Sequence, residues 1–158
     1  MINRRKFLKT GALGSASLLF KKHIFVTTNN FSPTILSTWS SNVQANNSAW
    51  AVLQNNGRAL DAIEKGIRVT EADPTDNSVG YGGSPDRDGV VTLDACVMDE
   101  FGNCGSVMAL EQIMHPISVA RLVMQKTRHV QLAGEGALQF AIAQGFKKQN
   151  PRILSLGF

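Results

Sequence analysis

Apolar residues recur at helical spacing near the middle of the chain. Five of them fall at positions i, i+3, i+4, i+7 and i+8 of one segment: Ala59, Ala62, Ile63, Gly66 and Ile67. Charged residues occupy positions between them, so the pattern predicts a helix with one apolar stripe. Residues 43–55 are predicted to form a preceding helix, with Gly57 as its left-handed cap.

Beyond residue 88 the pattern changes to that of a β-hairpin. Residues 89–98 are rich in β-branched and apolar side chains, and residues 104–110 form a similar run. Between them lies a short turn that contains Gly102 and Asn103. Two strand-like runs separated by a Gly/Asn turn predict a hairpin.

Shorter elements complete the pattern. Residues 34–38 and 129–133 are predicted to be short strands. Residues 116–126, which begin with a proline, and residues 135–144 are predicted to be helices. Because strands and helices interleave, the fold class is expected to be α/β (α+β) rather than all-β.

The basic charge of the chain is confined to its first residues. The net charge is +4, but residues 1–26 contain six basic residues and no acidic one, which leaves 10 basic and 12 acidic residues elsewhere. This distribution gives no reason to expect a nucleic-acid partner. The basic run includes the pair Arg4 and Arg5, and a short apolar run follows it at residues 11–20.

A basic segment followed by a short apolar run is typical of an export signal, and twin arginines indicate the Tat route. An apolar run of this length is too short to span a bilayer, for which about 20 residues are needed, so we expect no membrane anchor. We therefore expect residues 1–26 to be a Tat-type signal peptide and the protein to be exported to the periplasm.

The two cysteines, Cys96 and Cys104, lie on either side of the predicted turn. A spacing of eight fits neither a zinc pair nor a CxxC redox motif. An oxidising compartment would permit a disulfide between them, but the strand register that decides this does not follow from the sequence. Buried free thiols are the expected state.

No complete catalytic set is visible in the residues themselves. HExxH, GxSxG and Walker motifs are absent, and the lone His129 is expected to be a capping or core residue. The glycines of residues 80–83 do not match GxGxxG, and a strand follows them, which argues against a dinucleotide site. They imply close backbone approach or positive φ, for a ligand or for a sharp turn.

Six stretches, taken in order, nevertheless carry a family resemblance. They are residues 36–39 (Leu-Ser-Thr-Trp), 57–66, 78–86 (Ser-Val-Gly-Tyr-Gly-Gly-Ser-Pro-Asp), 92–99, 116–121 and 145–148 (Gly-Phe-Lys-Lys). Their order and spacing resemble the glycosylasparaginase family (aspartylglucosaminidases), which are N-terminal-nucleophile hydrolases of the asparaginase type 2 group. Residues 27–150 resemble the family's alpha subunit, and residues 151–158 diverge from it.

The resemblance implies a four-layer αββα sandwich, made from a precursor that cleaves itself. The exposed threonine then hydrolyses the amide between N-acetylglucosamine and asparagine, with its own α-amine as base. No cofactor and no metal are implied. From the pattern alone Trp39 would be a core aromatic at a strand end, but the resemblance places Trp39 in the substrate pocket and Ser78 nearby.

The nucleophile of the family follows an aspartate, and none of the nine threonines of this chain does. We therefore expect no catalytic residue here, but the N-terminal part of an amidohydrolase that is inactive without a C-terminal (beta) half. A non-catalytic secreted remnant or binding module is one alternative. Part of an isoaspartyl peptidase or asparaginase is another, although Trp39 argues against it, because those relatives tend to carry a glycine-rich stretch there.

Overall fold

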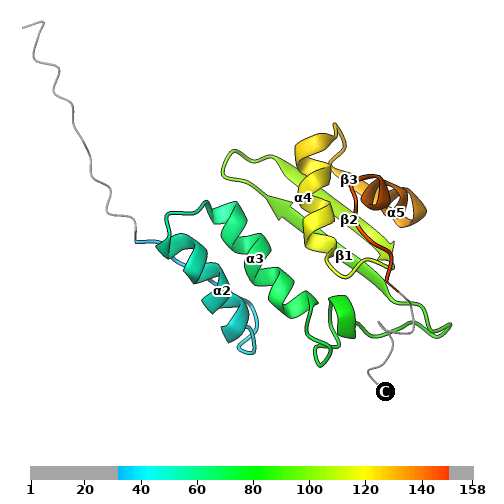
Figure 1. Cartoon of the computed structure of the whole chain (residues 1–158), viewed down its shortest axis with the longest axis horizontal. Helices are drawn as coiled ribbons and strands as arrows, with labels where there is room; N and C mark the ends of the chain where they lie inside the picture. The colour runs from blue at the N-terminus through cyan, green and yellow to red at the C-terminus, as the bar shows by residue number, and fades with distance from the viewer. Residues whose placement is uncertain (1–31, 150–158) are drawn as a thin grey trace, which may run out of the picture. The chain divides into compact units, whose positions relative to one another are not determined.

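A computed structural model describes residues 32–149, in which helices and strands interleave as predicted (Figure 1). The elements are α2 (Val43–Gln54), α3 (Ala59–Glu71), the 3₁₀ turn η1 (Gly80–Gly82), β1 (Thr92–Met98), β2 (Cys104–Glu111), α4 (Pro116–Lys126), β3 (Gln131–Ala133) and α5 (Gly134–Ala143). The predicted signal peptide at 1–26 and the divergent tail at 151–158 lie outside the described residues. Within residues 32–149, every helix is too short or too polar to cross a membrane.

The strands within residues 32–149 form one three-stranded sheet in the order β1-β2-β3. The predicted hairpin is confirmed: β1 and β2 are antiparallel, and Met98 pairs with Cys104 next to the turn. β3 adds to β2 in parallel. The predicted strand at 34–38 is wrong, because the described structure has no regular secondary structure at residues 32–37 and a bend at residue 38.

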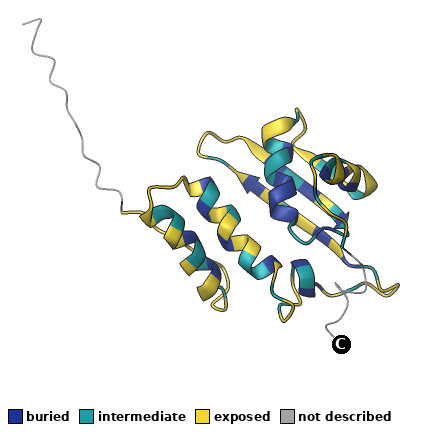
Figure 2. Ribbon diagram, in the orientation of Figure 1, coloured by how far each residue is buried: buried dark blue, intermediate teal, exposed yellow. Residues whose placement is uncertain are grey.

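One face of the sheet is covered by α4 and α5, and the main core lies between them (Figures 1 and 2). The core residues of β2, α4 and α5 include Val107, Leu110, Val123 and Leu138, all at most 3% exposed. Gly105 lets α4 approach β2 closely, since a Cβ at this position would lie 2.6 Å from the backbone nitrogen of Met124. Burial of these apolar side chains is the main force that holds the two layers together.

Helices α2 and α3 cross closely beside this core. A Cβ on Gly66 would lie 2.9 Å from the carbonyl oxygen of Ala45, so only glycine fits the crossing without movement. The predicted cap is off by one residue, because the positive φ of 57° belongs to Asn56 and not to Gly57. Gly57 is instead needed for space, since a Cβ there would collide with the Val52 side chain.

The predicted apolar stripe of α3 is only partly buried. Ala62 and Gly66 are buried against α2, as the pattern indicates. Ile63 and Ile67 belong to the same stripe, but their exposed fractions are 43% and 38%. Within residues 32–149, no element covers this side of α3 fully, and the exposed isoleucines line a hollow.

Candidate functional site

A hollow of about 810 Å³ lies on the exposed side of α2 and α3. Its walls come from three segments, namely residues 34–42, the two helices, and the loop at residues 75–79. The two residues that the family resemblance assigned to the substrate pocket, Trp39 and Ser78, both line it. The fold thus brings together two residues that are 39 positions apart in the sequence.

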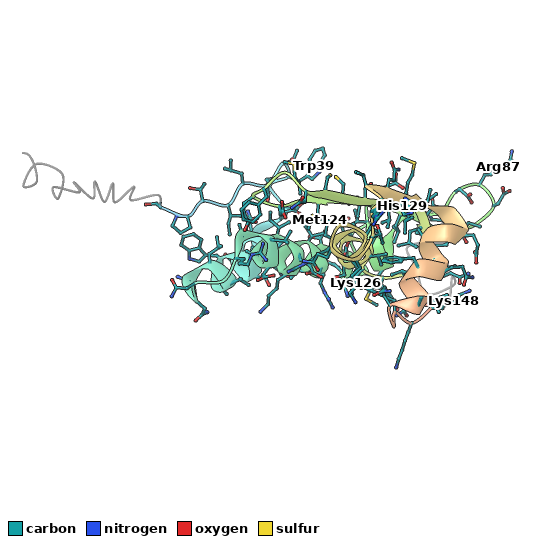
Figure 3. The ribbon with its side chains drawn as sticks, turned by 90° about the horizontal axis from the view of Figure 1, so that it is seen from above. Trp39, Arg87, Met124, Lys126, His129 and Lys148 are labelled. Atoms are coloured by element: carbon teal, nitrogen blue, oxygen red, sulfur yellow. The ribbon has the colours of Figure 1, made fainter. Side chains whose placement is uncertain are left out.

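Trp39 lies in the bend that leads into α2 (Figure 3). Its backbone carbonyl accepts a hydrogen bond from the Asn42 N–H, which fixes the bend. The side chain is 72% exposed, so the alternative that Trp39 is a core aromatic is wrong for the described structure. An exposed indole offers apolar area, a stacking face and one N–H donor. Its substrate-binding role stays a prediction.

Ser78 lies at the other wall, in a loop shaped by aspartate side chains. Asp76 accepts hydrogen bonds from both the N–H and the hydroxyl of Ser78, and Asp73 does the same for Thr75. The side-chain hydrogen bond from Thr75 lowers the pKa of Asp73. Because the Ser78 hydroxyl proton points to Asp76, its oxygen can accept a hydrogen bond from a ligand.

The floor of the hollow is apolar and its rim is polar. Ala45, Ala49 and Gly66 form the floor where α2 and α3 cross, and Ile63 and Ile67 extend it. Serine, threonine and asparagine side chains supply the rim on both walls. Among the described residues, no histidine or cysteine lines the hollow.

The glycine-rich loop of residues 80–83 is explained by packing rather than by a ligand. Gly80 has a φ of 60°, and a Cβ on it would collide with the backbone of Glu71 at the end of α3. A Cβ on Gly82 would collide with the carbonyl oxygen of Asp76. Of the two alternatives left open by the sequence, the structure supports the sharp turn.

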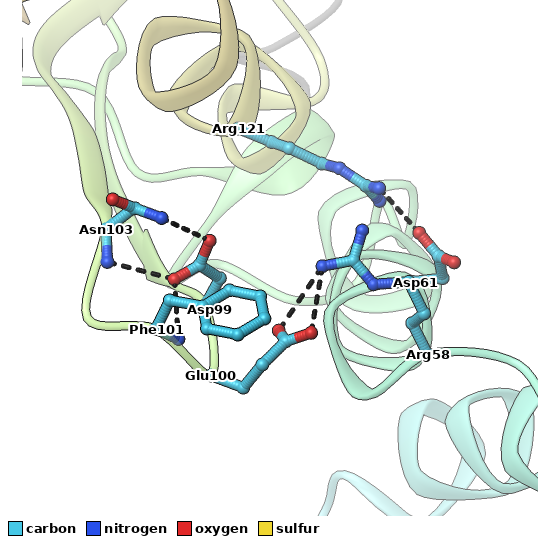
Figure 4. Close-up of polar contacts among 7 residues, drawn as sticks. All are labelled: Arg58, Asp61, Asp99, Glu100, Phe101, Asn103 and Arg121. Carbon is cyan, nitrogen blue, oxygen red and sulfur yellow. Dashed lines mark hydrogen bonds and ion pairs between the residues drawn. The ribbon is translucent and has the colours of Figure 1, made fainter.

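Two polar clusters that the sequence did not reveal join α3 to α4. Arg121 donates to Glu64 at 2.6 Å and to Asp61 at 2.5 Å, and Figure 4 shows the contact with Asp61. Burial lowers the pKa of Arg121, but the hydrogen bonds to the two carboxylates outweigh it and raise the pKa overall. No local motif predicts these contacts, because the partners are 57 and 60 residues apart.

The second cluster surrounds Glu71, whose side chain is 2% exposed. One carboxylate oxygen accepts the N–H of Ile117 at 2.9 Å, and the other lies 3.1 Å from Nδ1 of His115. Ile117 belongs to the first turn of α4, where unpaired N–H groups favour a negative partner. Glu71 therefore caps α4 from the end of α3, and the cluster has a structural role.

The burial predicted for the two cysteines, and the core position that was one of two alternatives for His129, are wrong. Cys96 and Cys104 are free, as expected, but both are exposed rather than buried. They lie on the open face of the sheet, where the register pairs Cys104 with Met98 and Cys96 with Ser106. His129 is exposed and is therefore not a core residue; its N–H donates to the Thr127 hydroxyl.

Comparison with known proteins identifies the family. A family model described as asparaginase matches residues 32–156, which is most of the chain. The chain belongs to this asparaginase family. The match includes both walls of the hollow as well as the sheet.

Comparison with individual proteins shows which members of the family the chain is similar to. The chain is 55% identical over 157 residues to an N(4)-(beta-N-acetylglucosaminyl)-L-asparaginase of Elizabethkingia miricola, with 94% of this chain and 46% of the relative covered. It is 41% identical over 119 residues to the mouse protein of that name, with 75% and 34% covered. It is 42% identical over 107 residues to an isoaspartyl peptidase of Salmonella typhimurium, with 66% and 33% covered. The chain thus spans about half the length of the first relative and about a third of the others.

Proposed function

We propose that this chain is one half of an amidohydrolase that cleaves the amide between N-acetylglucosamine and asparagine. The proposal is carried by one observation: Trp39 and Ser78, which the family resemblance assigns to the pocket, line the same hollow. The identity to a glycosylasparaginase, higher and over more of the chain than the identity to the isoaspartyl peptidase, supports this substrate over a β-aspartyl peptide.

The nucleophile in this proposal is a threonine supplied by the other half of the enzyme. Its hydroxyl adds to the amide carbonyl carbon while its own α-amine takes the hydroxyl proton. The α-ammonium then gives this proton to the amide nitrogen, so the C–N bond breaks, the glycosylamine leaves and an acyl–threonine ester remains. Water then cleaves the acyl–threonine ester and releases aspartate. In this chain Trp39 would present its ring to the substrate and Ser78 would accept a hydrogen bond, so both residues bind and orient.

The open face of the sheet supports the finer proposal of a four-layer αββα sandwich. Helices cover one face, while the other presents Met98 and Met108, which are 62% and 49% exposed, together with Cys96 and Cys104. A sheet with a largely uncharged outer face is suited to packing against a second sheet at about 10 Å. The second sheet would come from the complementing half.

We also propose that the protein is exported by the Tat route, on the basis of Arg4, Arg5 and the short apolar run that follows. Replacing both arginines with lysine keeps the charge but removes the twin-arginine signal. Cell fractionation should then find the protein in the cytoplasm, whereas an unchanged periplasmic fraction would refute the Tat route.

The pocket assignment is tested by Trp39→Ala in a full-length chimera, in which this chain replaces the matching part of the Elizabethkingia miricola relative. Loss of the ring removes apolar contact and stacking, together about 1.5–3 kcal/mol, which corresponds to roughly a 10- to 150-fold fall in kcat/KM. Trp50→Ala is the matched control, because Trp50 is 38% exposed on α2 and does not line the hollow.

The chimera should cleave N-acetylglucosaminyl-asparagine, and Trp50→Ala should leave that activity unchanged. An equal loss in both variants would mean that Trp39 acts through folding and would remove the pocket assignment. Faster cleavage of a β-aspartyl dipeptide than of the glycosylated substrate would instead favour an isoaspartyl peptidase.

A further inference from the structure

The loop that forms one wall of the hollow carries a single carboxylate. Among the described residues that line the hollow, Asp76 is the one with an ionisable side chain. It is half-buried, whereas Ser78 beside it is exposed and within reach of a ligand. A negative charge on an otherwise neutral wall favours ligand groups that are cationic or that donate hydrogen bonds. Asp76 therefore influences what the hollow can bind.

One oxygen of the Asp76 carboxylate holds Ser78 at two points. Oδ1 accepts the Ser78 backbone N–H at 2.9 Å and also the Ser78 hydroxyl hydrogen. A serine hydroxyl has one hydrogen and two lone pairs, so its only hydrogen is committed to Asp76. The Ser78 oxygen then meets a ligand as an acceptor and has no hydrogen left to donate. Without Asp76, the side chain could turn among three staggered positions and could donate as well as accept.

The backbone of this loop is fixed without the help of the Asp76 side chain. The Asn77 carbonyl accepts hydrogen bonds from both the N–H and the hydroxyl of Ser84, each at 3.0 Å. A Cβ on Gly82 would lie 2.4 Å from the Asp76 carbonyl oxygen, so η1 packs directly on the loop. Removing the Asp76 carboxylate would therefore release the Ser78 side chain and leave the loop in place.

We propose that Asp76 is a positioning residue, which holds the Ser78 oxygen as an acceptor for an N–H group of the bound substrate. The inference rests on the proposed function, because that function supplies the substrate. N-acetylglucosaminyl-asparagine has N–H groups in its amides and in its ammonium group, and the Ser78 oxygen can accept from any of them. A substrate carbonyl or carboxylate at the same place would find no hydrogen to accept and would stay unpaired. Asp76 thus acts on the substrate through Ser78.

The test is a double-mutant cycle on Asp76 and Ser78 in the full-length chimera, with N-acetylglucosaminyl-asparagine as substrate. Ser78→Ala removes the acceptor and should lower kcat/KM about tenfold, the effect of one hydrogen bond. Asp76→Ala should lower it about 3- to 10-fold, because the hydroxyl then samples three staggered positions and loses a polarising partner.

The decisive comparison is Asp76→Ala in the Ser78→Ala background. It should lower kcat/KM no further, because no hydroxyl is left to position. Additive losses would overturn the proposal, since Asp76 would then act on the substrate independently of Ser78.

Two further variants separate positioning from a general effect on the loop. Asp76→Asn keeps an oxygen that can accept both Ser78 hydrogens, so its kcat/KM should lie within about twofold of the unmodified chimera. Asp73→Ala is the matched control, because Asp73 accepts the N–H and hydroxyl of Thr75 in the same way but does not line the hollow. It should leave kcat/KM unchanged. Equal losses in Asp73→Ala and Asp76→Ala, or as large a loss in Asp76→Asn, would overturn the proposal.

Hydrogen exchange checks the contact without relying on activity. In Asp76→Ala the Ser78 amide loses its acceptor and should exchange at least about tenfold faster. The Ser84 amide, which donates to the Asn77 carbonyl, should exchange as slowly as before, because the loop keeps its fold. Unchanged exchange at Ser78 would contradict the hydrogen bond, and faster exchange at Ser84 would mean that Asp76 holds the loop. Either result would overturn the proposal.

Failure of the proposed function is a distinguishable outcome. If the unmodified chimera cleaves a β-aspartyl dipeptide but not N-acetylglucosaminyl-asparagine, the proposed function fails and the cycle is measured with the dipeptide, which also has an amide N–H and an ammonium group. If it cleaves neither, isothermal titration calorimetry with N-acetylglucosaminyl-asparagine gives the same cycle on Kd. Non-additive losses would then support the positioning role alone. Absence of binding to the unmodified chimera would overturn both proposals.

Discussion

Gly105→Ala tests the central packing contact of the fold, the approach of α4 to β2. A methyl group at this position would lie 2.6 Å from both Cβ and the backbone nitrogen of Met124, and closer still to the carbonyl oxygen of Ala120. Ordinary van der Waals contacts lie at about 3.5–4 Å, so α4 would have to move away from the sheet by about 1 Å.

The expected loss of stability follows from the packing contacts of α4 that this movement would break. Val119, Ala120 and Val123 of α4 are each 0% exposed, so a shift of the helix opens gaps along the whole interface. Overpacking a core costs about 1–3 kcal/mol and sometimes more, and here the obstacle is backbone that cannot change rotamer. We expect Gly105→Ala to lower the free energy of unfolding by at least about 3 kcal/mol.

The control is the same substitution at Gly136. Gly136 lies in the first turns of α5, and a Cβ there would have no neighbouring atom within 4 Å, so Gly136→Ala should stabilise the protein by about 0.5–1 kcal/mol through helix propensity. Urea unfolding followed by far-UV circular dichroism measures both variants. If the free energy of unfolding of Gly105→Ala lies less than about 1 kcal/mol below that of Gly136→Ala, the close approach of α4 to β2 is refuted.

Further predictions concern the polar contacts. Glu71→Ala should lower the free energy of unfolding by about 3 kcal/mol, because it leaves the buried N–H of Ile117 unpaired, whereas Glu100→Ala on the surface should change it by less than about 1 kcal/mol in the same urea assay. The Asn103 side chain, which donates to Asp99, lowers the pKa of that carboxyl from 3.8 (Figure 4). This hydrogen bond therefore stabilises the folded state above pH 3.8. The stabilisation is lost as the pH falls through the lower pKa that Asp99 has in the folded state. NMR titration of Asn103→Ala should show the pKa of Asp99 rising toward 3.8, and an unchanged pKa would refute the assignment.

Much of the fold was predictable because its elements are defined by local patterns. The helix at residues 116–126 matches α4, since Pro116 marks its first position and the apolar periodicity runs to its end. The hairpin was predictable for the same reason, because the Gly102 and Asn103 turn separates two strand-like runs. Contacts between distant segments, such as Arg121 with Asp61, leave no local pattern and were not predicted.

The errors in the prediction share a physical cause. A strand at 34–38 and full burial of the α3 stripe both require a neighbour that is not among the described residues. The thiols of Cys96 and Cys104 were expected to be buried, and they face outward from an uncovered sheet. The local sequence determines which secondary structure a segment favours. Whether the segment pairs or is buried depends on the other segments that pack against it.

The candidate site, too, was only partly predictable from the sequence. Trp39 and Ser78 were identified through resemblance, and the structure adds that they line one hollow. The residues themselves gave no reason to connect them, because neither lies in a motif with a base or a metal ligand. The binding roles proposed for them depend on a substrate and on a threonine that, in the proposal, the complementing half supplies.

The central claim is that the chain contributes a pocket wall but no nucleophile to a glycosylasparagine hydrolase. The direct measurement is aspartate release from N-acetylglucosaminyl-asparagine by the purified chain, by the complementing half that begins at its threonine, and by the two combined. The account predicts no turnover by the chain alone and turnover by the combination. Steady turnover by the chain alone, retained after repurification, would contradict it.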